Sequence, residues 1–257
     1  MPYGAPDLSL AATIKPMAST SLLPNRAHAP QTLLFDADDT LWENNIYFER
    51  AIAAFITYLD HRVHTAEEVR EHLNIVERAT ISQHGYGLKS FRRSLVTCFE
   101  QLTDAPVTDE KHRRIVSFAE SIAEQEIELL PGVAETLPVL AARHELHLIT
   151  KGDLVEQNDK LDRSGLRPYF AEVEVLSEKT EAAYRSLADQ HGFNRDTTWM
   201  IGNSPRSDIN PSLSAGLNAI FIPHDFTWVL EHEVVDAPPP GRTLLELASF
   251  QDLILHF

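Results

Sequence analysis

The chain contains a single cysteine, Cys98, among its 257 residues. One cysteine excludes an internal disulfide framework and a metal site built from four cysteines. Cys98 lies close in sequence to Leu95, Val96 and Phe99. We therefore expect a buried thiol within a hydrophobic core.

Long apolar runs are also absent, since no stretch approaches the roughly 18 residues that a membrane-spanning helix needs. Residues 1–30 contain five prolines and lack a basic start followed by a sustained apolar segment. This composition is not typical of a secretory signal and favours a disordered N-terminal tail. We expect a cytoplasmic protein, and Met17 is an alternative start to Met1.

Basic residues are scarce, with 22 Lys and Arg against 38 Asp and Glu and a formal net charge of −16. A nucleic-acid-binding protein would need a basic face, so this balance argues against one. An anionic substrate must instead be held by a local cationic site rather than by the overall field. We expect no nucleic-acid or membrane partner, and a monomer or homodimer.

From residue 32 onward, short apolar runs alternate with helical patterns. This alternation predicts an α/β fold with a Rossmann-like, doubly wound parallel sheet. A hydrophobic content of 43% is enough for one such domain and an insertion. The predicted strands are Thr32–Phe35, Leu146–Thr150, Glu172–Val175, Thr198–Ile201, Ala219–Ile222 and Thr243–Leu245.

More than 100 residues separate the first two predicted strands, whereas a simple crossover needs only about a dozen. Their 3.6-residue periodicity predicts amphipathic helices over 45–60, 65–83, 88–102 and 109–128. The length and the helical pattern of this segment therefore predict a small helical domain inserted into the α/β domain. The predicted organisation is a tail over 1–30, an α/β core over 31–43 and 130–257, and a helical domain over 44–129.

Three carboxylates follow the first predicted strand, at Asp36, Asp38 and Asp39. At an extended strand end, residues two apart project to the same side, so Asp36 and Asp38 can act on one substrate. A calcium loop of the EF-hand type would need Gly and Glu where the chain has Leu41 and Tyr47. Asp39 is expected to cap the turn or helix that follows.

Other strands also end in polar residues. Thr150 precedes a tight turn and a helix, where a hydroxyl and backbone N–H groups can hold a phosphoryl group. Lys179 stands at the start of a helix, where the helix dipole disfavours a cation unless an anion is near. Asn203 and Asp208 follow the fourth strand. Ligand sites of open α/β sheets lie at the carboxyl ends of strands, so we expect these side chains to converge.

The sequence Asp-x-Asp-x-Thr after a strand, followed in order by the Thr150, Lys179 and Asp208 segments, resembles the four motifs of the haloacid dehalogenase superfamily. The resemblance covers roughly residues 32–225. It implies phosphoryl transfer through an aspartyl-phosphate, with Asp36 as nucleophile and Asp38 as general acid/base. Thr150 would contact a phosphoryl oxygen, and Lys179 would neutralise the phosphoryl group and restrain Asp36.

The resemblance also implies a Mg²⁺ cofactor. Its protein ligands would be Asp36, the backbone carbonyl of Asp38 and Asp208. Asn203 stands where the family has a second acid, so one negative charge is missing from the expected metal site. The Asn203 amide can still offer a carbonyl oxygen or a hydrogen bond behind the ligands.

In this superfamily a helical insertion directly after the first motif is a C1-type cap, which closes over the substrate and contacts its leaving group. Candidate substrate-binding residues are Asn45, Tyr47, Lys89, Lys151 and Gly152, with Asn44, Tyr86 and Arg92 close to them in sequence.

The resemblance favours a phosphatase acting on a small phosphorylated metabolite. Similar proteins act on phosphoglycolate, sugar phosphates, nucleoside monophosphates or flavin mononucleotide. The alternatives are a phosphomutase of the same family and a catalytically weak binding or scaffold protein, which the departure at Asn203 would explain. Asp38 disfavours a dehalogenase, because breaking a carbon–halogen bond needs no proton donor.

Overall fold

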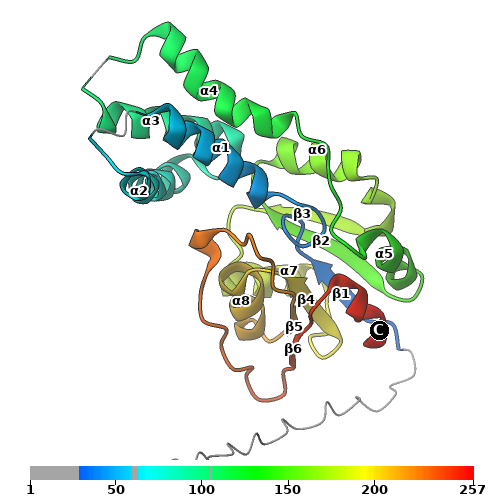
Figure 1. Ribbon diagram of the computed structural model, residues 1–257. Coiled ribbons are helices and arrows are strands. Elements are labelled where there is room, and N and C mark those ends of the chain that lie inside the picture. The colour runs from blue at the N-terminus through cyan, green and yellow to red at the C-terminus, as the bar shows by residue number, and fades with distance from the viewer. Residues whose placement is uncertain (1–28, 60–62, 105) are drawn as a thin grey trace, which may run out of the picture.

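The computed structural model describes residues 29–59, 63–104 and 106–257. It has two parts, an α/β core and a group of four helices beside the core (Figure 1). Most of the predicted tail, residues 1–28, lies outside the described residues, and so does the choice between Met1 and Met17. Within the described residues, no helix is both long and apolar enough to cross a membrane.

The core is a six-stranded sheet in the order β3-β2-β1-β4-β5-β6, and all neighbouring strands are parallel. The predicted α/β class, and each of the six predicted strands, is confirmed to within a few residues. The strands are β1 Thr32–Phe35, β2 Glu145–Lys151, β3 Glu172–Leu176, β4 Thr198–Gly202, β5 Asn218–Phe221 and β6 Leu244–Glu246.

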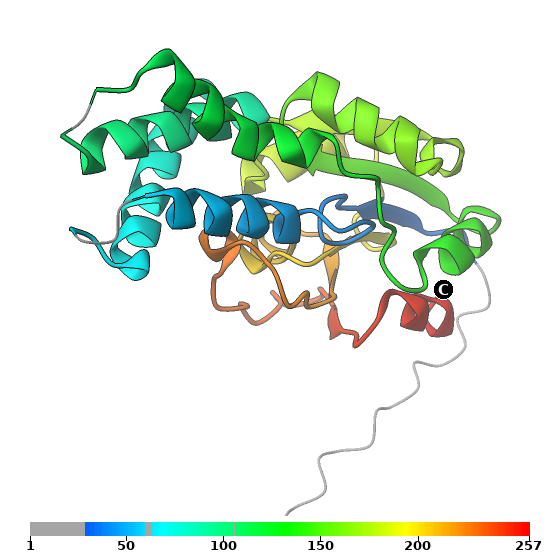
Figure 2. The ribbon, with the colours of Figure 1, turned by 45° about the horizontal axis from the view of Figure 1, so that its top comes forward.

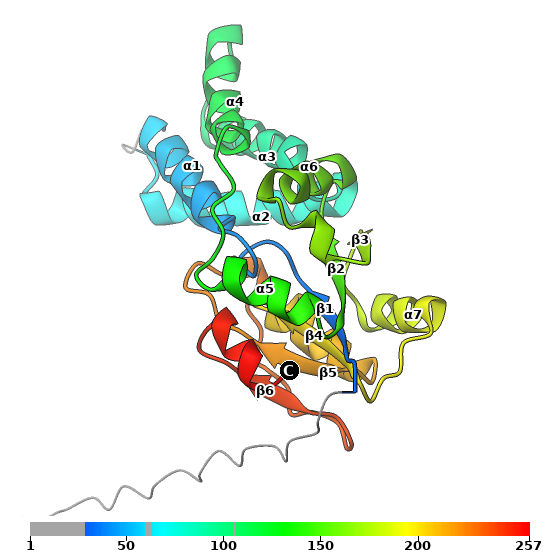
Figure 3. The ribbon, with the colours of Figure 1, turned by 90° about the vertical axis from the view of Figure 1, so that its right-hand side faces the viewer.

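Helices cover both faces of this sheet, because alternate residues of each strand point to opposite sides. Leu33 and Phe35 pack on one face with α5 (Val133–Ala141), whereas Leu34 packs on the other with α7 (Glu181–His191). Figure 3 shows these two helices on opposite sides of the sheet. The helices are α1 Asn45–Tyr58, α2 Ala66–His84, α3 Leu88–Leu102, α4 Asp109–Ala123, α5 Val133–Ala141, α6 Leu154–Ser164, α7 Glu181–His191 and α8 Asn210–Ser214.

Helices α1 to α4, called the helical insertion below, have a hydrophobic core of their own. Phe55, Leu73, Leu95 and Ile115 are fully buried in it, and Cys98 is buried there as predicted. The insertion begins directly after β1, at the position expected of a C1-type cap. A separate core favours the predicted division into two domains, whose boundaries stay a prediction.

The last helix of the insertion ends at Ala123, so the prediction that it continues to 128 was wrong. The reason lies in the path back to the core. The Glu43 N–H donates to the Glu128 carbonyl (2.9 Å), and the Leu130 N–H donates to the Leu41 carbonyl (3.0 Å). The chain therefore leaves and re-enters the core along two extended segments that lie side by side (Figure 2).

Candidate active site

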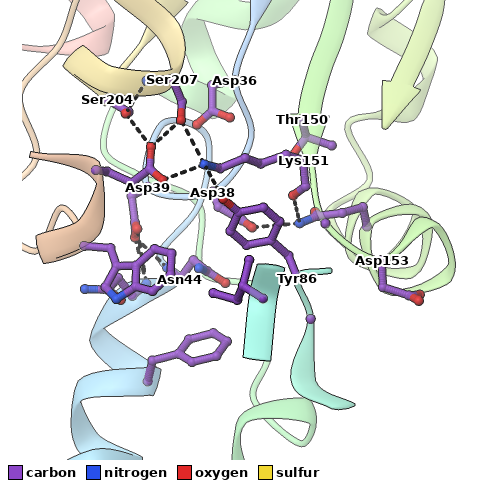
Figure 4. Close-up of a pocket in the computed structure, with 18 of the residues that line it drawn as sticks. Asp36, Asp38, Asp39, Asn44, Tyr86, Thr150, Lys151, Asp153, Ser204 and Ser207 are labelled. Atoms are coloured by element: carbon purple, nitrogen blue, oxygen red, sulfur yellow. Dashed lines mark hydrogen bonds and ion pairs between the residues drawn. The ribbon is translucent and has the colours of Figure 1, made fainter. Parts of the chain in front are cut away.

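The polar strand ends predicted from the sequence meet at one edge of the sheet. Strands β2, β1 and β4 are neighbours, and their carboxyl ends lead to Thr150, Asp36 and Asp208. Lys179 follows β3 and reaches the same place (Figure 4 shows part of this pocket). The pocket between this edge and the helical insertion is lined by all six main predicted residues, Asp36, Asp38, Thr150, Lys179, Asn203 and Asp208.

Lys179 joins two buried carboxylates. Its Nζ donates to Asp36 Oδ1 and, at 2.7 Å, to Asp208 Oδ1. Burial lowers the pKa of Lys179, but the two carboxylates outweigh burial and raise it above its ordinary value. Burial and the nearby Asp208 raise the pKa of Asp36 to about 7, although Lys179 acts to lower it. The pair of carboxylates thus carries more negative charge than one ammonium group neutralises.

Asn203 belongs to this cluster, and among the described residues its side chain forms hydrogen bonds with two neutral hydroxyl groups. The Thr40 hydroxyl lies within hydrogen-bond distance of both Asp36 Oδ2 (3.1 Å) and Asn203 Oδ1 (3.2 Å). The Asn203 amide nitrogen donates to the Thr227 hydroxyl (3.1 Å). The Thr40 hydroxyl thus lies between the Asn203 amide oxygen and the Asp36 carboxylate.

Asp38 has a different environment from Asp36, although only one residue separates them. Lys160 Nζ contacts both of its oxygens at 2.8 and 3.0 Å, and Gln157 and the Trp42 indole each donate at 2.8 Å. Burial acts to raise the pKa of Asp38, but the Lys160 ammonium and these hydrogen bonds lower it overall. Two carboxylates with opposite pKa shifts can take different roles in one reaction.

Asp39 serves the backbone, as the sequence predicted. Its carboxylate accepts the N–H groups of Asn44 and Asn45 at 2.9 Å each, where helix α1 begins. Burial raises its pKa to about 7 against the effect of these hydrogen bonds. Asp39 also lies near Glu43 and His224, and ligand atoms of these three residues are all within 4.8 Å of one another.

The predicted substrate-binding residues divide into two groups. Asn45, Lys151 and Gly152 line the pocket. Tyr47 and Lys89 do not, so the structure does not bring them to the site. The Tyr47 hydroxyl donates to Glu128 (3.3 Å), and Lys89 is exposed. Each lies on the wrong face of its helix, because neighbouring positions of the same helices are the ones that point into the pocket.

The helical insertion contributes a mixed wall that sequence reasoning largely missed. The residues from 44 to 94 that line the pocket include aromatic and apolar side chains, two amides, three small residues and one acid. They are Asn44, Asn45, Phe48, Glu77, Ile81, Tyr86, Gly87, Ser90, Phe91 and Ser94. Helical spacing signalled that such positions share a face, but it did not tell which face meets the core.

Lys151 is held by a network that no sequence motif indicated. Its Nζ donates to Glu231 (2.5 Å), to the Ser207 hydroxyl (2.8 Å) and to the Tyr86 hydroxyl (3.3 Å), and Figure 4 shows it reaching between Ser207 and Tyr86. Burial acts to raise the pKa of Glu231, but Lys151 and hydrogen bonds from Ser204 and Ser207 lower it. Glu231 was missed because it lies nine residues beyond the predicted strand Ala219–Ile222 and not directly at a strand end.

The comparisons with known proteins agree with this geometry. The haloacid dehalogenase-like hydrolase family matches residues 30–216, which is more than half of the chain. The chain belongs to this family. A crystal structure of a haloacid dehalogenase-like family hydrolase from Xanthomonas campestris is 32% identical, with a TM-score of 0.72. The similarity covers 88% of the present chain and 93% of the other.

Two curated relatives of this chain are pyrimidine 5′-nucleotidases. PynA of Streptococcus pneumoniae is 27% identical over 86% of this chain and 92% of its own length. YjjG of Escherichia coli is 26% identical over 86% and 96%. A crystal structure of the HAD-hydrolase YfnB of Bacillus subtilis, bound to magnesium, shares the fold. It is 16% identical with a TM-score of 0.62 and covers 89% of this chain and 99% of its own.

Proposed function

We propose that this hydrolase is a Mg²⁺-dependent phosphatase that hydrolyses a small phosphomonoester through an aspartyl-phosphate on Asp36. The main support is the pair of buried carboxylates, Asp36 and Asp208, that share the single ammonium of Lys179. A phosphomonoester needs a nucleophile, a proton donor and positive charge around phosphorus. Asp36, Asp38 and Lys179 offer these three functions in one pocket.

The donor set fits a magnesium ion. Mg²⁺ prefers oxygen ligands and is commonly held by one or two carboxylates together with substrate phosphate and water. The carboxylates of Asp36 and Asp208 and the backbone carbonyl of Asp38 would hold it. Burial and the negative charge of Asp208 raise the pKa of Asp36, and a bound cation would offset both effects by favouring the ionised carboxylate. When bound, the ion would reduce repulsion between the nucleophile and the phosphoryl oxygens.

The residues of the chain then have separate tasks. An oxygen of Asp36 attacks phosphorus as the bond to the leaving oxygen breaks, and Asp38 gives that oxygen a proton. Asp38 then takes a proton from the water that hydrolyses the aspartyl-phosphate. Burial acts to raise the pKa of Asp38, but Lys160 lowers it and so favours the ionised form that the second step needs, whereas the first step requires the protonated form. Thr150 and Lys179 would hold the phosphoryl oxygens.

We infer further that the substrate is a nucleoside 5′-monophosphate. Both named nucleotidases align over most of this chain. The pocket supports this class because its core end is polar, whereas its helical end carries the aromatic side chains Phe48 and Phe91. A nucleotide has the same polarity, with a phosphate at one end and a flat ring at the other.

Phosphate release from a panel of nucleotides and sugar phosphates tests the proposal. We expect Mg²⁺-dependent release from nucleoside monophosphates, a loss of at least a thousandfold in Asp36→Asn, and unchanged activity in Asp189→Asn. Asp189 is an exposed acid paired with Arg195, and it controls for the loss of one negative charge. Full activity in a folded Asp36→Asn protein or in chelator would reject the mechanism. Isomerised sugar phosphate without phosphate release would indicate a phosphomutase instead.

A further inference from the structure

Glu77 is a buried acid within the helical insertion, far in sequence from every motif of the family. It lies on α2, follows the apolar positions Val69, Leu73 and Val76, and is only 5% exposed. Its Oε2 atom has no hydrogen-bond partner among the described residues. Burying a carboxyl group without a partner costs free energy, so the helix would be more stable with an apolar side chain here.

Among the described residues, Glu77 forms no ion pair with a Lys, Arg or His side chain. Arg70 lies near enough to act on the pKa of Glu77, but its guanidinium group forms a bidentate pair with Glu49. It donates two hydrogen bonds to the Glu49 carboxylate, at 2.9 and 2.7 Å. Burial, the largest effect, raises the pKa of Glu77 to about 7, and Glu49 adds to it while Arg70 opposes it. The carboxyl group is therefore available for a partner that comes from outside the chain.

Such a partner can reach Glu77, because this residue lines the same pocket as Asp36. Phe48 and Phe91 line the pocket too, with their rings edge to face at a centroid distance of 5.0 Å. Ser94 adds a hydroxyl whose proton is donated to the Ser90 carbonyl (3.1 Å), so its oxygen can accept a hydrogen bond from a ligand. The wall thus combines flat apolar surface with a carboxyl group and an acceptor hydroxyl.

We propose that Glu77 determines specificity by hydrogen bonding to the polar edge of a pyrimidine ring that lies against Phe48 and Phe91. This inference rests on the proposed phosphatase function, with the phosphate of the same nucleotide at Asp36. A pyrimidine base presents a donor beside an acceptor, which are the amino group and N3 of cytosine or N3–H and a carbonyl oxygen of uracil. A protonated carboxyl group complements either edge with one donated and one accepted hydrogen bond.

Two substitutions at position 77 test the proposal, with nucleotides and substrates that lack a base compared in parallel. We expect Glu77→Met to lower kcat/KM for cytidine and uridine 5′-monophosphate by at least thirtyfold. The same variant should hydrolyse ribose 5-phosphate and p-nitrophenyl phosphate within twofold of wild type. Glu77→Gln keeps a donor and an acceptor and should restore part of the nucleotide activity. A pyrimidin-2-one nucleotide lacks the exocyclic group at C4. It should therefore be a poorer substrate than cytidine 5′-monophosphate for the wild-type protein, and an equally good one for Glu77→Met.

Folding and binding measurements separate this role from a structural one and from a failure of the proposed function. A specificity role predicts that Glu77→Met unfolds at a higher urea concentration, because a buried carboxyl group without a partner is removed. Calorimetry measures the binding of cytidine 5′-monophosphate to Asp36→Asn and to the double variant Asp36→Asn with Glu77→Met, neither of which should turn the nucleotide over. We expect at least tenfold weaker binding to the double variant than to Asp36→Asn. Equal losses for nucleotides and p-nitrophenyl phosphate, or unchanged nucleotide binding, would overturn the proposal for Glu77. Wild-type protein that releases phosphate from no substrate would overturn the phosphatase function alone.

Discussion

Asp208 packs directly against the backbone of Gly202, so closely that a Cβ atom at position 202 would lie 2.3 Å from Asp208 Oδ2. This approach lets Oδ2 accept the Ser204 N–H (3.0 Å) while Oδ1 accepts from Lys179 (2.7 Å). The glycine that ends β4 is thus required by the carboxylate that follows it. A larger residue at position 202 would displace the Asp208 carboxylate from its present position.

Gly202→Ala should therefore damage the fold through Asp208. Overlap at this distance forces the carboxylate to move, and we expect a loss of about 1–3 kcal/mol in the free energy of unfolding, as for other overpacked sites. Urea denaturation of Gly202→Ala measures it. The control is a double-mutant cycle with Asp208→Gly, because Asp208 Cβ would itself lie 2.7 Å from the new methyl group, and Gly202→Ala should cost much less once that side chain is removed. Equal costs in both backgrounds would show that the Asp208 contact is not the cause.

The Lys151–Glu231 ion pair is expected to matter for stability, since both side chains are largely buried. Lys151→Met leaves Glu231 without its cation, and removing one partner of a buried pair costs about 3 kcal/mol or more. Replacing both residues, as Lys151→Met with Glu231→Gln, should recover much of that loss. Thermal and urea unfolding measure the stability of the single and the double variant relative to wild type. A double variant as unstable as the single one would mean that the charge of Glu231 is not what Lys151 compensates.

Glu156 of the core supplies a cap to helix α3 of the insertion. The N-cap residue Gly87 has no capping side chain, and the Leu88 N–H donates instead to Glu156 at 3.1 and 2.9 Å. The bond joins the insertion to the core beside the pocket, which both Gly87 and Glu156 line, so its loss should disturb the pocket wall. Glu156→Ala should raise KM about fivefold with a smaller change in kcat, since such a cap is worth about 1 kcal/mol.

Glu156→Gln is the matched variant, because its amide oxygen still accepts from the Leu88 N–H. We expect it to keep most of the wild-type KM. Hydrogen exchange should also show faster exchange of the first α3 amides in Glu156→Ala than in Glu156→Gln. Identical exchange and kinetics in the two variants would contradict a capping role across the two parts.

Asn203 sets the charge of the proposed metal site, so Asn203→Asp should change its affinity for Mg²⁺. A third carboxylate beside Asp36 and Asp208 adds repulsion without the ion and attraction with it. We expect lower stability than wild type in chelator and at least tenfold tighter Mg²⁺ binding. Thermal unfolding over a Mg²⁺ titration reports both effects, because a ligand of the folded state alone raises its stability. Asn203→Ala should lack the gain in affinity, and a Mg²⁺ response identical in all three proteins would exclude Asn203 from the site.

The sequence predicted which side chains lie together at the carboxyl edge of the sheet, because strand ends and motif spacing are local features. Asp36, Thr150 and Asp208 each follow an apolar run, and parallel strands bring such ends together. Glu77 and Glu231 could not be predicted in this way, because their positions in the site depend on residues far away in the sequence. Glu231 pairs with Lys151, and Glu77 lines a pocket formed with the α/β core. Lys89 shows the remaining limit, because a helical period does not say which face of a helix meets another part of the chain.

The pH dependence of stability should also reveal Glu77. Its pKa rises from 4.5 in the unfolded chain to about 7 in the folded protein. Between these values the folded state binds more protons, so the free energy of unfolding falls as pH rises and levels off above the folded pKa. At about 1.4 kcal/mol per pH unit, the loss attributable to Glu77 is about 3 kcal/mol. Asp36 and Asp39 also have raised pKa values, but they contribute equally to wild type and Glu77→Gln. Urea denaturation at pH 5 and at pH 8 therefore measures the free energy of unfolding for wild type and for Glu77→Gln. Between these pH values it should fall by about 2–3 kcal/mol more in wild type than in Glu77→Gln. An equal fall in both proteins would place the pKa of Glu77 near its ordinary value.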